Sequence, residues 1–251
     1  MTNNENTKLR IAALGDLHVK ETSRGTYQSL FEEISKNADV LLLCGDLTDL
    51  GLVTEAEVLV KELQSATIPK IAVLGNHDYE NDKQSDITQL LQKSGIVVLY
   101  GTDYIYEKEG VKFGFTGAKG FGGGFRPSIW GRFGEPEQKA FYDAVSDEVQ
   151  QLENGINRLM RTADLSNMFV LLHFSPIRET LHGELKELYA FLGSTRLEEV
   201  IDRYPLSAVF HGHSHFGYPK GKTEKGIPVY NTAYPLIQKH TPKTPYVLVE
   251  F

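Results

Sequence analysis

The order of apolar and polar positions predicts alternating strands and helices in residues 9–99. Short apolar runs closed by glycine or a turn are typical of strands buried on both faces, whereas apolar residues spaced three or four apart indicate helices. The runs predict strands at 9–14, 40–44, 71–74 and 96–99, and the spaced patterns predict helices at 27–37, 54–64 and 87–93. Thr54, with Glu57 three residues later, is interpreted as the cap of its helix. This alternation predicts a parallel sheet with right-handed crossovers.

The pattern changes in the second part of the chain. Two short strand patterns flank Lys108-Glu109-Gly110 and predict a hairpin, and residues 117–134 form a loop rich in glycine and aromatic residues. Beyond them the pattern predicts helices at 135–161, 185–191 and 195–203, and strands at 168–172, 208–210, 229–230 and 246–250. Because no repeat, linker or break in composition interrupts the chain, we expect a single domain over residues 9–251 after a flexible tail at 1–8.

Composition narrows the class of protein. An apolar content of 41% and a charged content of 24% are ordinary for a soluble globular protein. No apolar run approaches the roughly 20 residues that span a membrane, and the polar N-terminus lacks the core of a signal peptide. The single cysteine, Cys44, lies inside an apolar run, so it is interpreted as a core residue in a reducing cytoplasm. A net charge of −7 disfavours broad electrostatic binding to nucleic acid or acidic membranes.

Acid–base and metal-binding side chains follow several predicted strands, at the point where each ends. They are Asp16 and His18; Asp46 and Asp49; Asn76, His77 and Asp78; His173; and His213 and His215. The carboxyl edge of an open α/β sheet is where ligands collect. Taken alone, Asp46 or Asp49 is explained equally well as a helix cap. Recurrence at several strand ends favours a shared partner, because unpaired polar groups in a buried place cost free energy.

A pair of metal ions is the simplest shared partner. Imidazole and carboxylate ligands without thiolate suit manganese, iron, zinc and similar divalent or trivalent ions. Asp16 and His18 are spaced to chelate one ion, and His213 and His215 to reach different ions. Asp46 is the candidate to bridge the two ions through its two oxygens. The residual positive charge would polarise a bridging water into hydroxide and attract an anionic substrate.

In this order, Asp-x-His, Gly-Asp-x-x-Asp, Gly-Asn-His-Asp, a His after a strand and Gly-His-x-His resemble the motifs of the calcineurin-like metallophosphoesterases. The motifs run from Asp16 to His215. The resemblance implies a four-layer α/β/β/α sandwich of two packed mixed sheets, with the metal site at the C-terminal ends of the strands. It implies that one ion is held by Asp16, His18, Asp46 and His215, and the other by Asp46, Asn76, His173 and His213.

The same resemblance assigns further roles. His77 would be the catalytic residue that donates a proton to the leaving oxygen or stabilises the transition state. Asp78 would orient His77, and Asp49 would support the ligands from behind. His211 is interpreted as a structural or supporting residue in preference to a ligand, and His182 and His240 as ordinary surface or pocket histidines.

The 117–134 loop has two interpretations of equal weight. Its aromatic residues, with Lys119, Arg126 and Arg132, could cover the metal site and contact the non-phosphate part of a substrate. The alternative is a mobile surface loop. The loop lacks the Gly-Lys-Ser/Thr ending of a nucleotide P-loop, which excludes that interpretation.

The leading functional prediction is a metal-dependent phosphoesterase that hydrolyses a small-molecule phosphodiester or phosphomonoester by attack of a hydroxide bridging two ions. A phosphodiesterase is favoured over a protein phosphatase, because the chain is close to the catalytic core in size and His77 suits a poor leaving group. A nuclease is the alternative, disfavoured by the net charge of −7 and the absence of a long basic patch. A second alternative is a non-catalytic metal-binding scaffold, which the intact ligand set disfavours. The sequence predicts that the protein has no membrane partner, and it does not bear on the oligomeric state.

Overall fold

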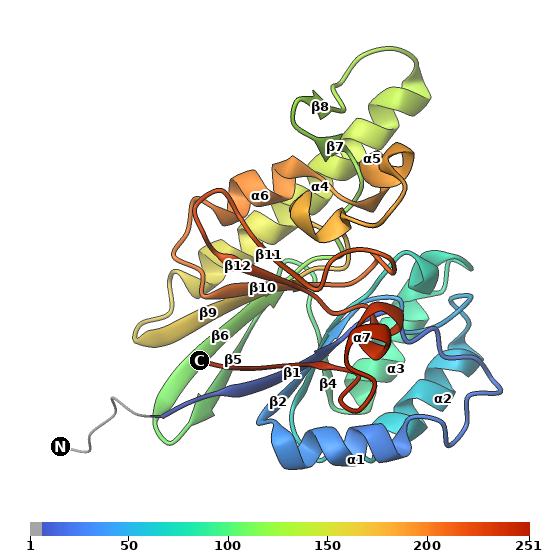
Figure 1. Cartoon of the computed structure of the whole chain (residues 1–251), viewed down its shortest axis with the longest axis vertical. Coiled ribbons are helices and arrows are strands. Elements are labelled where there is room, and N and C mark those ends of the chain that lie inside the picture. Colours follow the sequence, from blue (N-terminus) through green and yellow to red (C-terminus); the bar gives the residue numbers. More distant parts are fainter. Residues whose placement is uncertain (1–6) are drawn as a thin grey trace.

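Two sheets packed face to face, with helices on the outer side of each, make up the structure, a computed structural model that describes residues 7–251 (Figure 1). The strands are β1 (Arg10–Leu14), β2 (Val40–Cys44), β3 (Lys70–Val73), β4 (Ile96–Val98), β5 (Asp103–Lys108), β6 (Val111–Gly117), β7 (Gly124–Phe125), β8 (Ser128–Ile129), β9 (Leu165–Leu171), β10 (Ala208–His211), β11 (Lys220–Lys222), β12 (Pro228–Asn231) and β13 (Val247–Glu250). The helices are α1 (Gln28–Asn37), α2 (Val53–Leu63), α3 (Gln84–Lys93), α4 (Pro136–Leu159), α5 (Tyr189–Leu192), α6 (Thr195–Ile201) and α7 (Tyr234–His240), with short 3-10 helices at His77–Tyr79, Glu179–Leu181 and Lys186–Leu188.

Both sheets are mixed. The first has the order β13-β1-β2-β3-β4, in which β1 to β4 are parallel and β13 pairs antiparallel to β1. The second has the order β11-β12-β10-β9-β6-β5, with antiparallel pairing only at its two ends. Helices α1, α2 and α3 cover the outer face of the first sheet, and α4 and α6 that of the second (Figure 1). The predicted four-layer α/β/β/α sandwich is therefore confirmed.

Three apolar layers follow from the alternation of side chains along the strands. In β2, Leu41 and Leu43 pack toward the helices of the first sheet, whereas Leu42 and Cys44 face the second sheet. The central layer also contains Phe113, whose complete burial contributes about 1.5–3 kcal/mol. The third layer joins the other face of the second sheet to α4 and α6. A strand buried on both faces explains why 40–44 is an uninterrupted apolar run.

Local details differ from the sequence-based expectations. The cap assigned to Thr54 is wrong, because α2 begins one residue earlier and the Thr54 hydroxyl donates to Glu21 (2.6 Å). The carboxylate of Glu55 instead accepts from the backbone N–H groups of Leu50 and Leu52. Helix α7 and strand β11 were not predicted. Strand β11 has the sequence Lys-Gly-Lys, which contains no apolar residue to reveal a strand.

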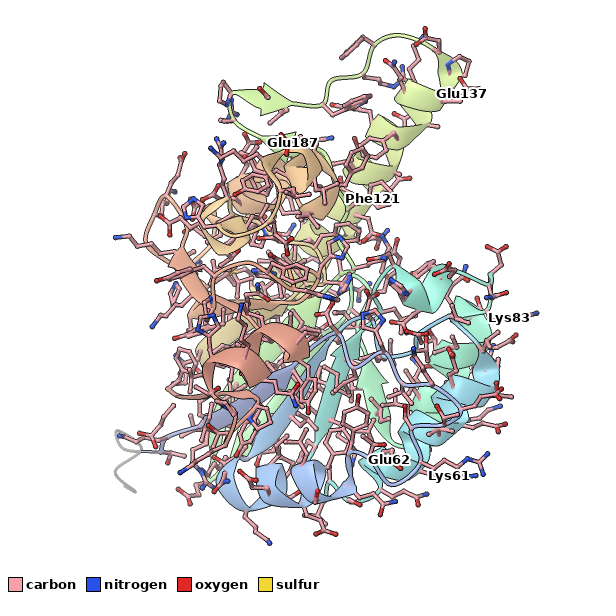
Figure 2. The ribbon with its side chains drawn as sticks, turned by 45° about the vertical axis from the view of Figure 1, so that its right-hand side comes forward. Lys61, Glu62, Lys83, Phe121, Glu137 and Glu187 are labelled. Atoms are coloured by element: carbon pink, nitrogen blue, oxygen red, sulfur yellow. The ribbon has the colours of Figure 1, made fainter. Side chains whose placement is uncertain are left out.

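The 117–134 segment leaves the second sheet and then packs on helices. Its β7–β8 hairpin lies against α5, and Trp130 packs against Phe141 of α4 with ring centroids 5.4 Å apart. Figure 2 shows the first turn of α4, marked by Glu137, projecting beyond the sheets beside this hairpin. The hairpin therefore extends along the helices of the second sheet.

Two further expectations concern the N-terminal tail and the absence of a membrane-spanning segment. Residues 1–6 of the predicted tail lie outside the described residues, whereas Lys8 forms an ion pair with Glu250 (2.6 Å). None of the helices in residues 7–251 combines the length and apolar character needed to cross a membrane.

Candidate metal centre

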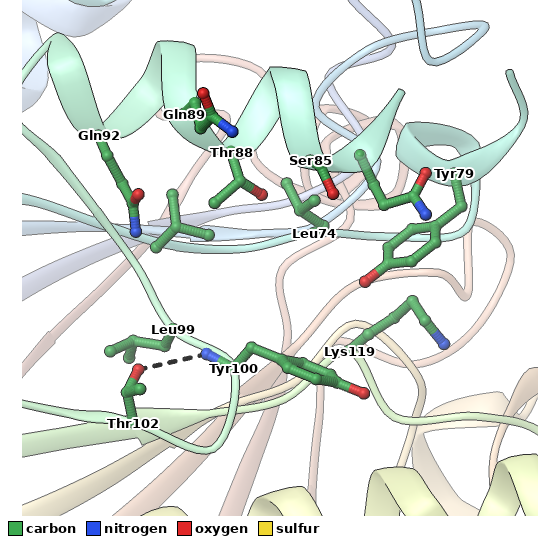
Figure 3. A pocket seen from close by; sticks show the side chains of 12 residues that line it. Leu74, Tyr79, Ser85, Thr88, Gln89, Gln92, Leu99, Tyr100, Thr102 and Lys119 are labelled. Carbon is green, nitrogen blue, oxygen red and sulfur yellow. Dashed lines mark hydrogen bonds between the residues drawn. The ribbon is translucent and has the colours of Figure 1, made fainter. Parts of the chain in front are cut away.

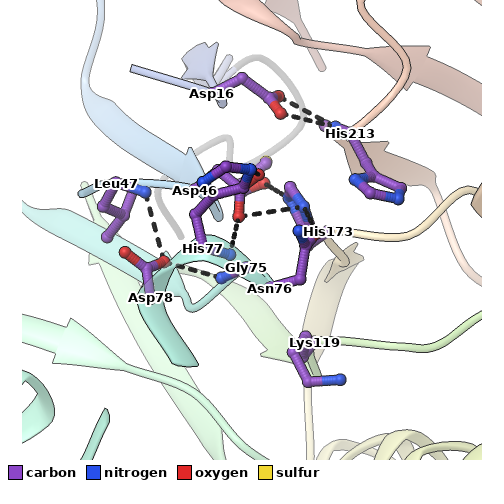
Figure 4. A network of polar contacts seen from close by, with 12 residues as sticks. Asp16, Asp46, Leu47, Gly75, Asn76, His77, Asp78, Lys119, His173 and His213 are labelled. Atoms are coloured by element: carbon purple, nitrogen blue, oxygen red, sulfur yellow. Dashed lines mark hydrogen bonds and ion pairs between the residues drawn. The ribbon is translucent and has the colours of Figure 1, made fainter. Parts of the chain in front are cut away.

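The strand ends of both sheets bring the predicted ligands to one place (Figure 4). Strands β1, β2 and β3 run parallel in one sheet, and β9 and β10 run parallel in the other. Within each sheet the carboxyl ends of these strands therefore lie along one edge, and the turns after them carry the polar side chains. The His and Asp groups whose ligand atoms lie close enough to share an ion are Asp16, His18 and His215; His18, Asp46 and His77; and Asp46, His173 and His213.

Unusual backbone geometry places several of these side chains. Asp16, His18, Asp46 and His213 have positive φ angles of 56°, 43°, 47° and 69°. Such a conformation costs a non-glycine residue of order 1–3 kcal/mol and is concentrated at functional sites. It turns the chain sharply just after a strand. The neighbouring Gly75 has to be glycine, because a Cβ there would overlap the backbone nitrogen and carboxylate of Asp46.

Asp46 lies at the centre of the cluster and is almost fully buried. Its Oδ1 accepts from the backbone N–H of His77 (2.8 Å) and lies 3.3 Å from Nε2 of His173. Its Oδ2 faces Nε2 of His18 at 3.8 Å and Nε2 of His77 at 4.0 Å. Burial opposes ionisation, but His173 and the His77 amide outweigh it and hold the pKa of Asp46 below its usual range. The two oxygens thus face two different sets of histidines, the arrangement expected of a bridging carboxylate.

Asp16 organises one side of the cluster. Its two carboxylate oxygens accept from the backbone N–H of His213 (3.0 and 2.9 Å). Nε2 of His215 lies 3.0 Å from Oδ1. Burial lowers the pKa of His215, but Asp16 outweighs burial and raises it. The rings of His18 and His215 lie 5.4 Å apart and approach the carboxylate together.

His173 organises the other side and is fully buried. Its Nδ1 donates to the carbonyl of Cys44 (3.0 Å), which directs Nε2 toward Oδ1 of Asn76 (2.9 Å) and Oδ1 of Asp46. A histidine that ligates a metal commonly donates its second ring N–H to a backbone carbonyl in this way. Burial lowers the pKa of His173, but Asp46 outweighs it and raises the pKa to about 9. The ring of His213 packs against it with centroids 4.7 Å apart.

The residues fit a pair of metal ions. Nε2 of His18 is buried and has no hydrogen-bond partner among the described residues, although Oδ2 of Asp46 lies 3.8 Å away. Burial lowers the pKa of His18 and favours the neutral form that ligates metals. Imidazole nitrogens, carboxylate oxygens and the Asn76 amide oxygen form a donor set suited to manganese, iron or zinc. A cation would give the orphaned nitrogen a partner.

His77 stands at the edge of the cluster. Its Nδ1 donates to the backbone carbonyl of Asp49 (2.6 Å), so Nε2 is turned toward Asp46. The side chain is 35% exposed, which leaves room for a substrate beside it. The carboxylate of Asp49 lies 3.5 Å from Nδ1 of His18. Asp49 therefore contacts both histidines, one through its backbone and one through its side chain.

The expectation that Asp78 orients His77 is wrong. Its carboxylate accepts from the backbone N–H groups of Gly75 (2.8 Å), Leu47 (3.2 Å) and Thr48 (2.8 Å) and from the Thr48 hydroxyl (2.6 Å). Among the described residues it makes no hydrogen bond to the His77 ring. Asp78 instead joins the turn after β3 to the turn after β2 (Figure 4). The Asp49 carbonyl that positions the ring was missed because a backbone atom leaves no trace in a sequence.

His211 is turned away from the ligands. Its Nδ1 donates to the carbonyl of Gly212 (2.7 Å), and Nε2 faces the hydroxyl of Thr180 (2.9 Å). Burial lowers its pKa to about 4. These contacts hold the turn that carries His213.

The cations of the 117–134 loop are already paired. Arg126 pairs with Glu199 of α6, and Arg132 pairs with Asp143 of α4 (2.9 Å). Neither lines the cavity that reaches Asn76, so the structure gives no support to the interpretation in which these two arginines cover the metal site. Their spacing in the sequence carries no information on the direction in which the loop leaves the sheet.

Lys119, by contrast, lies next to the cluster. Its Nζ pairs with Glu148 of α4 (3.0 Å) and donates to the carbonyl of Gly120 (2.7 Å). It lines the cavity beside Asn76. The sequence did not reveal Glu148 as its partner, because the two residues are brought together only by the packing of α4.

A family model described as calcineurin-like phosphoesterase matches residues 9–217. The chain belongs to the calcineurin-like phosphoesterase family. The resemblance inferred from the motifs is confirmed, and the family together with the clustered His and Asp side chains supports a metal-dependent phosphoester hydrolase.

A search of curated proteins found no match to the chain. Solved structures with the same fold are distant in sequence. Phosphopantetheinyl hydrolase (PptH) from Mycobacterium tuberculosis is 14% identical with a TM-score of 0.70, over 96% of this chain and 95% of that one. TT1561 from Thermus thermophilus is 16% identical with a TM-score of 0.58, over 92% of each chain. The NAD nucleotidase NadN from Haemophilus influenzae is 14% identical with a TM-score of 0.55, over 98% of this chain and 47% of that one. The TM-scores show a shared fold, and at these identities the likeness shows the fold alone.

Proposed function

We propose that this family member hydrolyses a phosphoester of a small molecule, with a phosphodiester favoured over a monoester. The observation that carries the proposal is the position of Asp46, whose two oxygens face His173 on one side and His18 and His77 on the other. Two bound ions would supply positive charge for the phosphoryl oxygens and lower the pKa of a water molecule. Manganese, iron and zinc suit the donor set.

The position of each residue indicates whether it would bind a metal ion or act on the substrate. Asp16, His18 and His215 would hold one ion, Asn76, His173 and His213 the other, and Asp46 would contact both. His77 would act on the substrate itself. Its Nδ1–H is held by the Asp49 carbonyl, so Nε2 is the atom available to donate a proton or a hydrogen bond to the leaving oxygen.

A small substrate is favoured over nucleic acid. The net charge of −7 repels a polyanion, and the cavity that reaches Asn76 has a volume of about 340 Å³. Asp147 lines that cavity and adds negative charge beside the centre, whereas Glu148 pairs there with Lys119. We also propose a cytoplasmic location, because the single, buried Cys44 requires no oxidising compartment.

Elemental analysis followed by a substrate panel tests the proposal. Chelated protein would be loaded with manganese, iron or zinc and assayed with aryl phosphodiesters, aryl monoesters, phosphopantetheinyl compounds and plasmid DNA. We expect metal-dependent turnover of small esters, fastest with a diester, and no turnover after chelation. Faster cleavage of DNA would favour the nuclease. Bound metal with no turnover of any ester would favour the non-catalytic scaffold and overturn the proposal.

A further inference from the structure

A groove beside the metal centre is not used by the proposed chemistry. One part, of about 400 Å³, lies between α3 and the loop that joins β4 to β5. The cavity that reaches Asn76 shares Tyr79, Tyr100 and Lys119 with it, so the two cavities adjoin, and together they are called the groove here. Figure 3 shows the rings of Tyr79 and Tyr100 on opposite walls beside Lys119. The groove therefore starts at a candidate ligand and leads away from it.

The lining of the groove is aromatic and polar but carries no spare positive charge. Helix α3 contributes uncharged amides and hydroxyls, among them Thr88 and Gln92, which face the loop carrying Tyr100 (Figure 3). Lys119 is the only cation among the described residues that line the two cavities, and Glu148 pairs with it. Asp147 adds a negative charge at the Asn76 end. A second phosphate placed beside Asp147 would be repelled, whereas Arg158 and Arg161 line a separate cavity that meets the groove at Tyr100 and Thr102.

We propose that this groove binds the second ester group of the substrate and selects an uncharged group with a flat face and hydrogen-bonding edges. The inference rests on the proposed function, because a phosphate held at the centre would direct its ester group past Asn76 into the groove. Tyr79 and Tyr100 offer faces for stacking, and the α3 side chains, Thr88 included, offer hydrogen bonds. Tyr100 is 45% exposed, so its ring is accessible to a ligand.

Binding measured on the metal-loaded full chain tests this, with three probes compared by calorimetry. Methyl phosphate has no group for the groove, thymidine 5′-phosphate has a flat uncharged one, and thymidine 3′,5′-bisphosphate adds a second charge. We expect thymidine 5′-phosphate to bind about tenfold more tightly than methyl phosphate, which is within the range for stacking of one base. The bisphosphate should bind no more tightly than thymidine 5′-phosphate.

Variants locate the effect. Tyr100→Ala should abolish the tenfold preference and leave the affinity for methyl phosphate unchanged, whereas Tyr100→Phe should retain most of the preference. Thr88→Val keeps the shape of the side chain and should reduce the preference a few-fold. The matched control is Tyr218→Ala, because Tyr218 is also exposed (59%) but does not line the groove.

Three results would overturn the inference. The first is equal binding of methyl phosphate and thymidine 5′-phosphate, and the second is tighter binding of the bisphosphate than of thymidine 5′-phosphate. The third is a preference that is lost in Tyr218→Ala but retained in Tyr100→Ala. Hydrolysis is measured in parallel with the substrate panel. Turnover without a Tyr100-dependent preference would leave the proposed function standing and reject the groove. A Tyr100-dependent preference without any turnover would reject the hydrolase and retain the groove as a binding site.

Discussion

Asp78→Asn should destabilise the fold of this protein, although it preserves the size of a buried side chain. The wild-type carboxylate accepts hydrogen bonds on both oxygens: from Thr48 on Oδ1, and from the backbone N–H groups of Leu47 and Gly75 on Oδ2. An asparagine amide has one accepting oxygen and one donating nitrogen. Whichever way the amide is turned, its NH₂ group meets N–H or O–H groups that also donate.

The magnitude follows from these contacts. If the amide oxygen stays with Thr48, two buried N–H groups lose their acceptor, at a cost of about 1–3 kcal/mol each. Removing the buried charge recovers part of this loss, because Asp78 is fully buried and burial disfavours its ionised form. We therefore expect the free energy of unfolding to fall by about 2–4 kcal/mol. Thr48→Val removes only the hydroxyl donor and should cost about 1 kcal/mol.

Urea unfolding of the chelated variants, followed by circular dichroism, measures this loss without any contribution from metal. Metal content and turnover of the loaded proteins are measured alongside, and we expect both to fall in Asp78→Asn because the turns that carry Asp46 and Asn76 are no longer joined. The reasoning is refuted if Asp78→Asn unfolds within about 0.5 kcal/mol of wild type and keeps its metal while kcat collapses. That outcome would restore Asp78 to the chemical role at His77 that the sequence suggested.

Three further substitutions test other parts of the molecule. Asp46→Asn should lower the content of both ions in elemental analysis, whereas Asp16→Asn should lower mainly one; equal losses would argue against Asp46 as the bridge. His77→Ala should retain metal and lose about a hundredfold or more in kcat, and unchanged kcat would remove His77 from the reaction. Burial opposes ionisation of Asp39, but hydrogen bonds from Arg10 and Lys108 outweigh it and hold the pKa of Asp39 at about 2, below its ordinary value of 3.8. Its contribution to stability is therefore present above about pH 4 and lost as pH falls toward 2, so Asp39→Asn should cost about 1–2 kcal/mol at pH 6 and almost nothing near pH 2; an equal cost at both pH values in urea unfolding would contradict this.

The sequence predicted best those features that depend on burial alone. Strand β2 was expected at residues 40–44 and is found there, because a strand covered on both faces has no polar position to blur its limits. The gathering of Asp16, Asp46 and His173 at one edge followed from parallel strands ending together. In both cases the information lies in side-chain type and order along the chain.

What could not be predicted depends on backbone atoms and on packing between distant segments. The carbonyl of Asp49 positions His77, and any residue at position 49 would supply a carbonyl. Arg126 and Arg132 are cations in a glycine-rich loop whether the loop covers the centre or follows α4 and α6. Tyr100 reaches the groove from the loop between β4 and β5, and Glu148 reaches it from α4, so their meeting depends on how these distant segments pack.

The backbone strain and the clustered charges of the centre have one physical consequence in common. The turns after β1 and β2 place Asp16, His18 and Asp46 at positive φ, each at a cost of order 1–3 kcal/mol. Backbone hydrogen bonds between these turns, from Asp16 to Gly45 (2.9 Å) and from His18 to Asp46 (3.0 Å), hold them in place. The same turns bring two buried carboxylates among histidines, an arrangement that a cation would stabilise. Since the fold supplies the strain and the charge that a cation would offset, metal affinity and the stability of these turns are linked, and a substitution that loosens either turn weakens both.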